Sequence, residues 1–242
     1  MSQLVNHAAH AGYGSLRWRP ERLEFRGTLW HLECAETPDD MLPTIAGLQY
    51  VSEYLDRETH DRLLTAVHLQ PWQTSNAHGV QVYGYHYNHK RRAAYRIGEL
   101  PAWARDLAVH LWRDGFLPSV PNQLVANDYR PGEGIFAHVD QAVFGDTIVS
   151  VSLGSTCVMQ FSNSEGERTE ELLLEPRSAL VLSGEARWAW KHEIPARAVD
   201  RWQNQERPRS RRVSLTFRVI PRSSEDDERA DSLVQDAQRS GA

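Results

Sequence analysis

The second half of the chain is a series of short segments in which apolar and polar residues alternate, and this feature limits the possible folds most strongly. At least seven such segments follow Gln123, each bounded by turn-forming residues, with no helical pattern between them. Many short strands in succession favour an antiparallel sandwich or jelly roll over a doubly wound parallel sheet. The segments are QLVANDY, TIVSVSL, CVMQF, ELLLE, SALVL, RWAWKH and RVSLTFRV.

Two helical patterns come before these strands. The first begins at Asp56, a suitable N-cap residue, and carries apolar residues on one face. The second covers residues 101–116, with Pro101 at its first position and Gly115 as the stop signal. We therefore expect a mainly β fold with flanking helices (α+β), in which two N-terminal helices pack outside the strands.

A length of 242 residues fits one elaborated domain, and 40% apolar with 24% charged residues excludes a collagen, a coiled coil or a wholly disordered chain. We expect a single domain over residues 21–221, with its core motifs in 121–221. The acidic tail 222–242 is poor in apolar residues and the start, residues 1–20, is rich in His, Ala and Gly, and we expect both to be disordered.

Neither a membrane span nor a signal peptide is visible, because no segment approaches ~18 uninterrupted apolar residues and the start lacks a basic region followed by an apolar one. We expect no membrane contact, a cytoplasmic location and, by default, a monomer. Cys34 and Cys157 are far apart, so neither a disulfide framework nor a thiolate zinc site is expected.

The triplet His138-Val139-Asp140 is the first candidate for chemistry. Residues i and i+2 of a strand share a face, so this imidazole and this carboxylate can be neighbouring ligands of one metal ion. A mononuclear non-haem iron site needs a second histidine, and His192 is the only histidine after His138. Taken alone, the triplet also fits a surface histidine and aspartate beside a turn.

The last strand, RVSLTFRV, is the second candidate. Alternation places Arg212, Ser214, Thr216 and Arg218 on one face. Two buried arginines need a counter-charge, which a dicarboxylate ligand supplies through paired hydrogen bonds. The alternative is an edge strand with a solvated polar face.

A third element lies just before His138. Asn127 and Tyr129 form another i, i+2 pair, and the following Pro-Gly turn leads the chain to the triplet. They can offer an amide and a phenol to the same pocket, although a core tyrosine with an ordinary partner is the simpler interpretation.

Together these residues form the pattern NxYxPGxxIxxHxD at 127–140, then His192, then RxxxxxR at 212–218. The pattern resembles the AlkB group of Fe(II)- and 2-oxoglutarate-dependent dioxygenases, over residues 47–221. The resemblance implies a double-stranded β-helix (jelly roll).

The same resemblance implies roles for individual residues. Iron would be held by His138, Asp140 and His192. The distal carboxylate of 2-oxoglutarate would bind Arg212 and Tyr129, with Arg218 and Asn127 near the iron-chelating end, and no further catalytic side chain is implied. The cofactors are then Fe(II), 2-oxoglutarate and O2. The reaction hydroxylates a C–H bond and, at an N-methyl group, releases formaldehyde from an alkylated base in DNA or RNA.

We expect the substrate lid in the segment VYGYHYNHKRRAAYR, which combines aromatic rings for base stacking with cations for phosphate. Its candidate contacts are Tyr83, Tyr85, Tyr87, Arg91 and Arg92. A second basic cluster covers residues 207–212. Basic clusters are more often solvated loops, and the net charge of −5 is not that of a strongly basic protein.

Several other substrates stay open. Repair members often have an acidic residue where this chain has Ala142, and some have a base-stacking tryptophan where it has Ser183. The segments DTIVSVSLGS and GEAR resemble the branch that hydroxylates a modified wobble uridine in tRNA. Two further alternatives are a dioxygenase that acts on a protein or a small molecule, and a binding module that has lost enzymatic activity.

Overall fold

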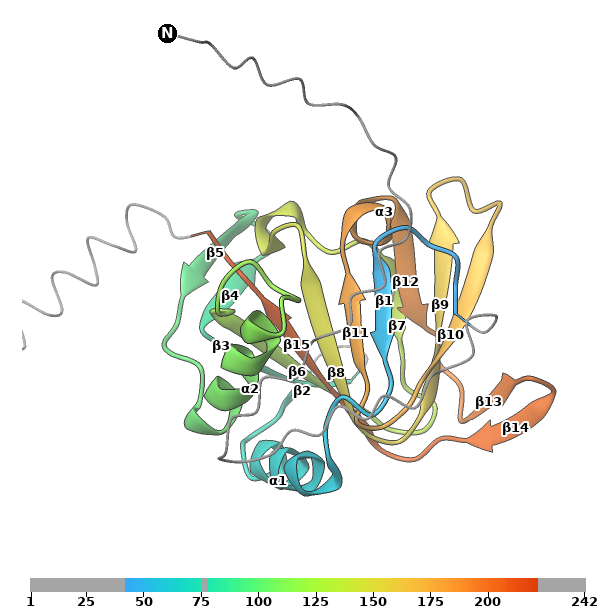
Figure 1. Ribbon diagram of the computed structural model, residues 1–242, viewed down its shortest axis with the longest axis horizontal. Helices are drawn as coiled ribbons and strands as arrows, with labels where there is room; N and C mark the ends of the chain where they lie inside the picture. The colour runs from blue at the N-terminus through green and yellow to red at the C-terminus, as the bar shows by residue number, and fades with distance from the viewer. Residues whose placement is uncertain (1–41, 75–77, 222–242) are drawn as a thin grey trace, which may run out of the picture.

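The computed structural model describes residues 42–74 and 78–221, and these form two β-sheets with helices on the outside of the larger one (Figure 1). Neighbouring strands in both sheets run antiparallel. The expected disordered segments 1–20 and 222–242, and Cys34, lie outside the described residues. The two facing sheets are the jelly roll that the sequence predicts.

The larger sheet has seven strands in the order β1-β11-β8-β15-β6-β3-β2. Six of the seven expected strand segments are found close to their predicted bounds in one sheet or the other, and β6 matches QLVANDY residue for residue. The bounds in this sheet are β1 (Leu48–Val51), β2 (Gln73–Thr74), β3 (Gly79–Tyr83), β6 (Gln123–Tyr129), β8 (Ile148–Gly154), β11 (Ala179–Leu182) and β15 (Arg212–Arg218).

The smaller sheet has four strands in the order β10-β9-β12-β7, so β7 is an edge strand. Two hairpins complete the β-structure, β4 (Tyr85–Asn88) with β5 (Ala93–Arg96), and β13 (Val199–Trp202) with β14 (Gln205–Pro208). The bounds in the smaller sheet are β7 (Ile135–His138), β9 (Cys157–Asn163), β10 (Thr169–Leu174) and β12 (Trp190–Ile194).

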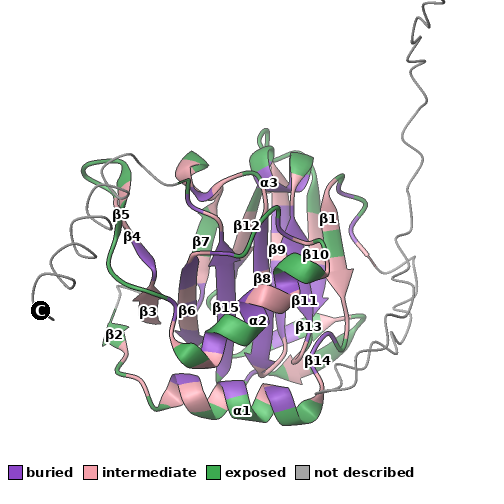
Figure 2. Cartoon of the chain, turned by 60° about the vertical axis from the view of Figure 1, so that its left-hand side comes forward, coloured by how far each residue is buried: buried purple, intermediate pink, exposed green. Residues whose placement is uncertain are grey.

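Helices α1 (Arg57–His68) and α2 (Ala102–Arg113) cover the outer face of the larger sheet (Figure 2). Asp56 caps α1 by accepting a hydrogen bond from the Thr59 backbone N–H at 2.7 Å. Pro101 is the N-cap residue of α2 and not its first helical residue. The main apolar core lies between these helices and strands β6, β8 and β15. No helix in the described part of the chain is long and apolar enough to cross a membrane.

Strand β15 is central, with β6 on one side and β8 on the other. Val213, Leu215 and Phe217 face the helices and belong to the main core. The residues between them face the smaller sheet, and every residue of the strand is buried. The alternative of an edge strand with a solvated polar face is therefore wrong.

Two parts of the expected strand pattern need correction. Strands β1 to β5 precede Gln123, where we expected helices and loops. Pairing with the larger sheet sets β1, β2 and β3 as strands, whereas β4 and β5 pair with each other as a separate hairpin. In RWAWKH, Arg187 and Trp188 instead end a short helix, α3 (Gly184–Trp188), and β12 starts at Trp190. The shift places His192 in the middle of its strand.

Candidate metal centre and the pocket beside it

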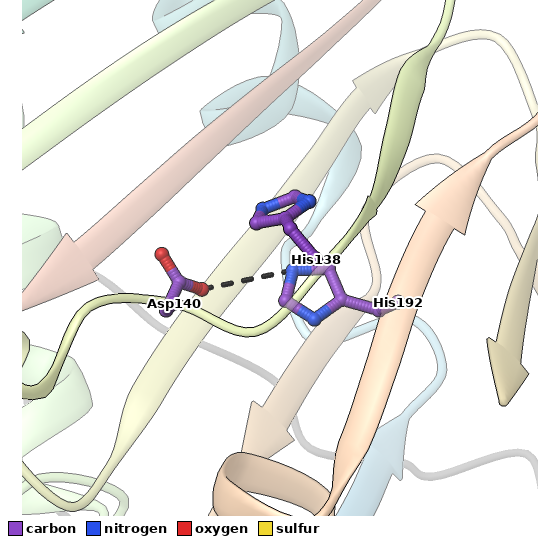
Figure 3. A group of neighbouring side chains, drawn as sticks. All are labelled: His138, Asp140 and His192. Atoms are coloured by element: carbon purple, nitrogen blue, oxygen red, sulfur yellow. Dashed lines mark ion pairs between the residues drawn. The ribbon is translucent and has the colours of Figure 1, made fainter. Parts of the chain in front are cut away.

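Three side chains meet at the end of the smaller sheet nearest α3, and they are the three predicted metal ligands (Figure 3). His138 ends β7, Asp140 follows it in the loop to β8, and His192 lies on β12 directly across from His138. The candidate ligand atoms all lie within 4.8 Å of one another, and His192 Nε2 is 3.6 Å from Asp140 Oδ2. Two histidines and one carboxylate in this arrangement suit a mononuclear non-haem iron.

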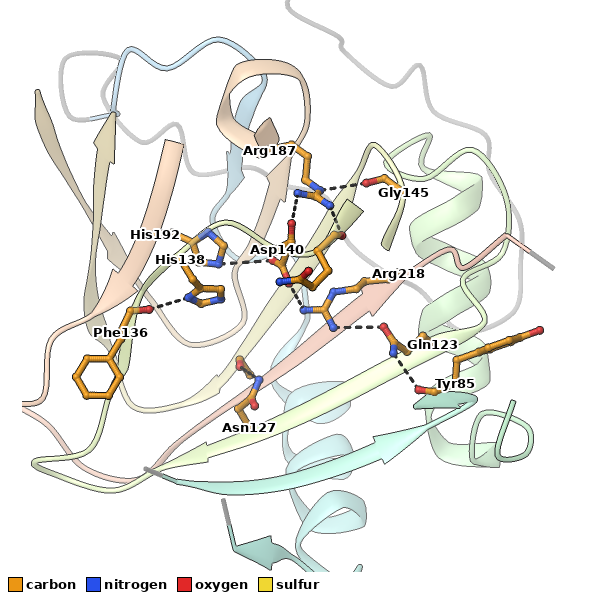
Figure 4. Close-up of polar contacts among 12 residues, drawn as sticks. Tyr85, Gln123, Asn127, Phe136, His138, Asp140, Gly145, Arg187, His192 and Arg218 are labelled. Atoms are coloured by element: carbon orange, nitrogen blue, oxygen red, sulfur yellow. Dashed lines mark hydrogen bonds and ion pairs between the residues drawn. The ribbon is translucent and has the colours of Figure 1, made fainter. Parts of the chain in front are cut away.

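The pairing of β7 with β12 shifts in register next to His138. Residues 138 and 135 of β7 pair with 192 and 194 of β12, so one strand has an extra residue between the two pairs. His138 Nδ1 is 2.7 Å from the Phe136 backbone carbonyl (Figure 4). In the tautomer that donates this bond, the free lone pair is on Nε2, as a metal-ligating imidazole requires.

Asp140 is a buried carboxylate with one charged partner. Its Oδ1 accepts a hydrogen bond from Arg218 Nη2 at 2.7 Å. Burial acts to raise the pKa of Asp140, but opposing effects, of which the charge of Arg218 is the largest, outweigh it and lower that pKa below its usual value. The carboxylate is therefore ionised at neutral pH, the form that binds a cation.

His192 is held neutral by its surroundings. Burial lowers its pKa to about 4, although the nearby charge of Asp140 acts in the opposite direction. A neutral imidazole has the lone pair that a metal ligand needs, so at neutral pH both His192 and Asp140 are in the protonation state suited to metal binding.

A pocket of about 510 Å³, including its open mouth, lies between the two sheets beside these three residues. Its walls combine apolar side chains from five strands with a line of polar ones from β6 and β15. The apolar ones are Ile135, Ile148, Met159, Leu180, Leu182 and Ile194, and the polar ones include Asn127, Tyr129, Arg212, Ser214, Thr216 and Arg218.

Arg212 lines the pocket with an incompletely paired guanidinium. It is 2% exposed, and Nη2 donates to Ser152 Oγ at 3.0 Å, while Nε and Nη1 are buried without a hydrogen-bond partner in the described structure. Tyr129 is its cross-strand neighbour, and the guanidinium lies 5.6 Å from the centre of that ring. A buried charge with unpaired donors calls for an anion, and a ligand carboxylate fits this geometry.

The other two predicted cosubstrate residues also face the pocket. Asn127 Nδ2 is 3.5 Å from Ser214 Oγ, its cross-strand partner. Arg218 lies at the metal end of β15, where Nη1 donates to Gln123 Oε1 at 3.3 Å in addition to the bond with Asp140. All seven predicted metal and cosubstrate residues are thus brought to one pocket.

The predicted substrate tyrosines do not share one surface, and two of them are not placed for base stacking. Tyr83 packs edge-on against Trp103 of α2, with ring centres 5.9 Å apart, and its hydroxyl donates to Gln81. Tyr85 is buried beside Phe144. The reason is Gly84, whose φ of +79° ends β3, so the expected alternation does not continue into β4. A Cβ at this position would lie 1.8 Å from the Asn122 carbonyl oxygen.

Tyr87 is different, because it adjoins the loop that carries Asp140. Its hydroxyl donates to Gln141 Oε1 at 3.2 Å, and its ring packs against Phe144. Arg91 and Arg92, with Lys90, lie exposed in the turn of the β4–β5 hairpin, and none forms an ion pair with a described residue. We call these three residues the basic turn.

The second basic cluster, residues 207–212, is not a free cationic surface. Arg209 is buried and pairs with Asp200 through two hydrogen bonds of 2.6 and 2.7 Å. Arg211 pairs with Asp128 at 2.7 and 2.8 Å, and Arg212 points into the pocket. Tertiary pairing thus removes most of the charge that the sequence displays there.

Two residues near the site, His78 and Gln123, were not singled out from the sequence, and a third, Arg187, entered only as part of the segment GEAR. His78 Nε2 is 3.0 Å from Asn127 Oδ1, Gln123 joins Arg218 to the backbone carbonyl of Tyr85, and Arg187 contacts the loop of Asp140. Gln123 could have been identified from the sequence, because it is the first residue of the predicted strand QLVANDY, whose Asn127 and Tyr129 are predicted to face the pocket. For His78 and Arg187 no local pattern exists, since their partners are 49 and 47 residues away along the chain.

Residues 47–218 match the family described as the 2OG-Fe(II) oxygenase superfamily. In mouse, the tRNA (carboxymethyluridine(34)-5-O)-methyltransferase ALKBH8 is 33% identical over 204 residues, which cover 73% of this chain and 31% of that protein. In Arabidopsis thaliana, the alkylated DNA repair protein ALKBH8 homolog is 32% identical over 206 residues, which cover 73% of this chain and 59% of that protein. This chain therefore spans about a third of the mouse protein and about three fifths of the Arabidopsis one.

The fold has a counterpart among solved structures. The structure of OsALKBH1 superposes with a TM-score of 0.52 at 16% identity, covering 72% of this chain and 96% of that one. At this identity the likeness supports the arrangement of the two sheets and nothing finer.

The low pKa of His192 predicts a pH dependence of stability in metal-free protein. Between pH 6.5 and about 4, the unfolded chain binds a proton at His192 that the folded chain does not, so stability falls as pH drops through this window. From pH 7 to pH 5 the loss should be about 1–2 kcal/mol larger in wild type than in His192→Gln. Urea denaturation with EDTA at both pH values measures it, and equal losses would contradict a buried neutral His192.

Proposed function

Because this chain belongs to the 2OG-Fe(II) oxygenase superfamily and is AlkB-like within it, we propose that it oxidatively dealkylates alkylated bases in DNA or RNA. The observation that carries the proposal is the pairing of two features in one pocket. One end has the His138, Asp140 and His192 group, and the wall has a buried arginine with two unpaired donors. The first suits Fe(II), and the second suits the distal carboxylate of 2-oxoglutarate.

The residues fit the metal by their chemistry. Two imidazoles and one ionised carboxylate supply three ligands and leave further coordination positions for a cosubstrate and oxygen. Arg218 holds the second carboxylate oxygen of Asp140, so the side chain is oriented before any metal arrives.

The residues also fit the cosubstrate. Nε and Nη1 of Arg212 are buried donors without a partner among the described residues, as expected of a guanidinium that pairs with a ligand carboxylate. Apolar side chains such as Met159, Leu180 and Ile194 can enclose the methylene groups and exclude water from the pocket. Burial raises the pKa of Tyr129, so its hydroxyl stays protonated and can donate to the same carboxylate.

Fe(II) bound there would supply activation of O2, coupled to conversion of 2-oxoglutarate into succinate and carbon dioxide, for oxidation of a substrate C–H bond. The protein's own part is positioning and electrostatics. Arg218 keeps Asp140 ionised, burial keeps His192 neutral, and Arg212 sets the direction in which the cosubstrate lies. A hydroxylated N-methyl group then breaks down to formaldehyde and the free base.

Two observations support a nucleic-acid substrate. The β4–β5 hairpin packs on Phe144 and Ile148 beside the metal loop, and its basic turn is exposed and free of described ion pairs. Cations of this kind contact phosphates, while bases stack on aromatic rings. In addition, the names of the mouse and Arabidopsis relatives refer to a tRNA uridine and to alkylated DNA.

A second candidate is hydroxylation of a modified wobble uridine in tRNA. It is favoured by the 33% identity with a mouse protein whose name refers to carboxymethyluridine at position 34. Succinate formation is common to both candidates, whereas formaldehyde release belongs only to the demethylation. The cytoplasmic location and the monomeric state stay predictions.

Turnover tests the proposal directly. We expect purified protein with Fe(II), ascorbate and 2-oxoglutarate under air to form succinate, faster with methylated single-stranded oligonucleotide or with tRNA bearing modified wobble uridine. Asp140→Ala should lower the rate at least ~100-fold because it removes one metal ligand. Asp146→Ala, an exposed aspartate of the same loop, is the control and should match wild type.

The outcomes separate the alternatives. Formaldehyde in proportion to succinate supports demethylation, and succinate without formaldehyde on tRNA supports the second candidate. If no nucleic acid changes the rate of succinate formation, the substrate is a protein or a small molecule. No turnover by metal-loaded wild type would refute the enzymatic proposal.

A substitution at Arg212 tests the cosubstrate site. Arg212→Met keeps the bulk but removes the buried donors, so KM for 2-oxoglutarate should rise about 10–100-fold. Arg211→Met removes the adjacent arginine, which pairs with Asp128 and does not line the pocket. Its KM should change by less than about 2-fold. Equal effects of the two substitutions would show that Arg212 does not bind the cosubstrate.

Removal of the basic turn tests the substrate surface. Lys90, Arg91 and Arg92 all changed to Ala should raise KM for an oligonucleotide substrate and weaken its salt dependence, with KM for 2-oxoglutarate unchanged. Arg62, Arg105 and Arg113 changed to Ala is the matched control, since these three exposed arginines lie on α1 and α2, on the other side of the larger sheet. Kinetics at several salt concentrations would reveal no difference between the two triple variants if the basic turn has no part in binding.

A further inference from the structure

Arg187 is a buried arginine whose hydrogen bonds all go to one loop. It is 2% exposed and is among the largest fully buried side chains. Nη1 donates to the Asp140 carbonyl oxygen at 2.9 Å, Nη2 to that of Gln141 at 2.7 Å, and Nε to that of Gly145 at 3.1 Å (Figure 4). Each guanidinium nitrogen therefore has its own backbone acceptor in residues 140–145.

These contacts are unusual for a buried arginine because none is to a carboxylate. In the described structure no carboxylate oxygen lies within ion-pair distance of the Arg187 guanidinium, which instead stacks on Trp188 at 4.1 Å. Burying a charge is costly unless its hydrogen bonds are satisfied. Here three carbonyl dipoles and one aromatic face satisfy it, so the side chain acts on the loop backbone.

The loop is short and contains a metal-ligand candidate. After Asp140 it forms a 3-10 turn, η2 (Ala142–Phe144), and reverses at Gly145 with a φ of +77°. Arg187 binds carbonyls on both sides of this turn. It therefore holds the backbone of Asp140, while Arg218 on β15 holds the carboxylate.

Arg187 also joins this loop to the segment of the third ligand candidate. It lies on α3, and the chain continues directly into β12, where His192 is five residues further on. Helix α3 is anchored in turn, because the Ala186 backbone N–H donates to the Ala46 carbonyl at 3.0 Å. One side chain thus ties the loop of Asp140 to the element of His192, although the two residues are 52 positions apart in the chain.

We propose that Arg187 is a positioning residue of the metal centre, which fixes the Asp140 backbone relative to His192 so that the ligands are assembled before metal binds. The inference rests on the proposed function, in that it takes these three residues to be metal ligands. Arg187 contacts neither metal nor substrate, and its effect is on the affinity of the metal-free protein for the ion.

Metal binding without turnover tests it. Metal-free protein is titrated with Co(II), a stand-in for Fe(II) that is stable in air, by isothermal titration calorimetry. Arg187→Met should raise Kd about 10–100-fold, the range seen when a residue supporting a ligand is lost. Arg209→Met is the matched control, because Arg209 is also buried but pairs with Asp200 outside the pocket. It should destabilise the fold and leave Kd within about 2-fold of wild type.

A second variant and a rescue keep the test decisive. Arg187→Lys keeps the charge but cannot span three carbonyls, so its Kd should lie between those of wild type and Arg187→Met. If Arg187→Met does not fold, the lysine variant decides, and a wild-type Kd there overturns the inference. In folded Arg187→Met, excess Fe(II) should restore kcat towards wild type, which a purely structural defect would not allow.

The two proposals fail in different ways. If wild type itself binds no Co(II), the metal centre is refuted. If wild type binds but Arg187→Met binds equally well, or Arg209→Met loses as much affinity, only the positioning role is refuted.

Discussion

Strand β15 lies between β6 and β8, and it supplies four of the polar side chains that line the pocket. Hydrogen bonds on both edges hold the strand in register, so its side chains alternate strictly between two environments. Val213, Leu215 and Phe217 pack under the helices, and the alternate residues enter the pocket. A slip of one residue would exchange the two sets and bury arginines in an apolar core. The hydrophobic face therefore fixes where the two arginines point.

The two arginines of β15 differ in whether a carboxylate of the described structure pairs with them. Arg218 is matched by Asp140 inside the protein, which keeps that carboxylate ionised at the metal end of the pocket. Arg212 pairs with no carboxylate in the described part of the chain and keeps two donors unpaired in a buried position. One guanidinium thus pairs with a candidate metal ligand, and the other keeps donors that a ligand anion could accept. A buried donor without a partner costs free energy, and an anion bound at Arg212 would recover it.

Much of the site could be predicted because its signals are local. Residues i and i+2 of an extended segment share a face, so the spacing of His138 with Asp140 and of Asn127 with Tyr129 is enough to predict that each pair points the same way. The substrate tyrosines could not be placed this way, because Gly84 breaks the alternation between Tyr83 and Tyr85. Arg187 has no local signal either. Its role exists only because α3 packs next to a loop more than forty residues earlier in the chain.

The sequence by itself determined most of the strand pattern, the polar face of β15 and which residues are the candidates for binding metal and cosubstrate, since period-two alternation and spacing are properties of neighbouring residues. Tertiary structure alone decided which charges are free. Arg209 and Arg211 are neutralised by Asp200 and Asp128, the basic turn is not, and Arg187 is assigned to backbone carbonyls. The physical reason is that a charged side chain is available to a ligand only if no other group of the protein pairs with it. The groups that pair here come together only when distant segments of the chain pack against each other.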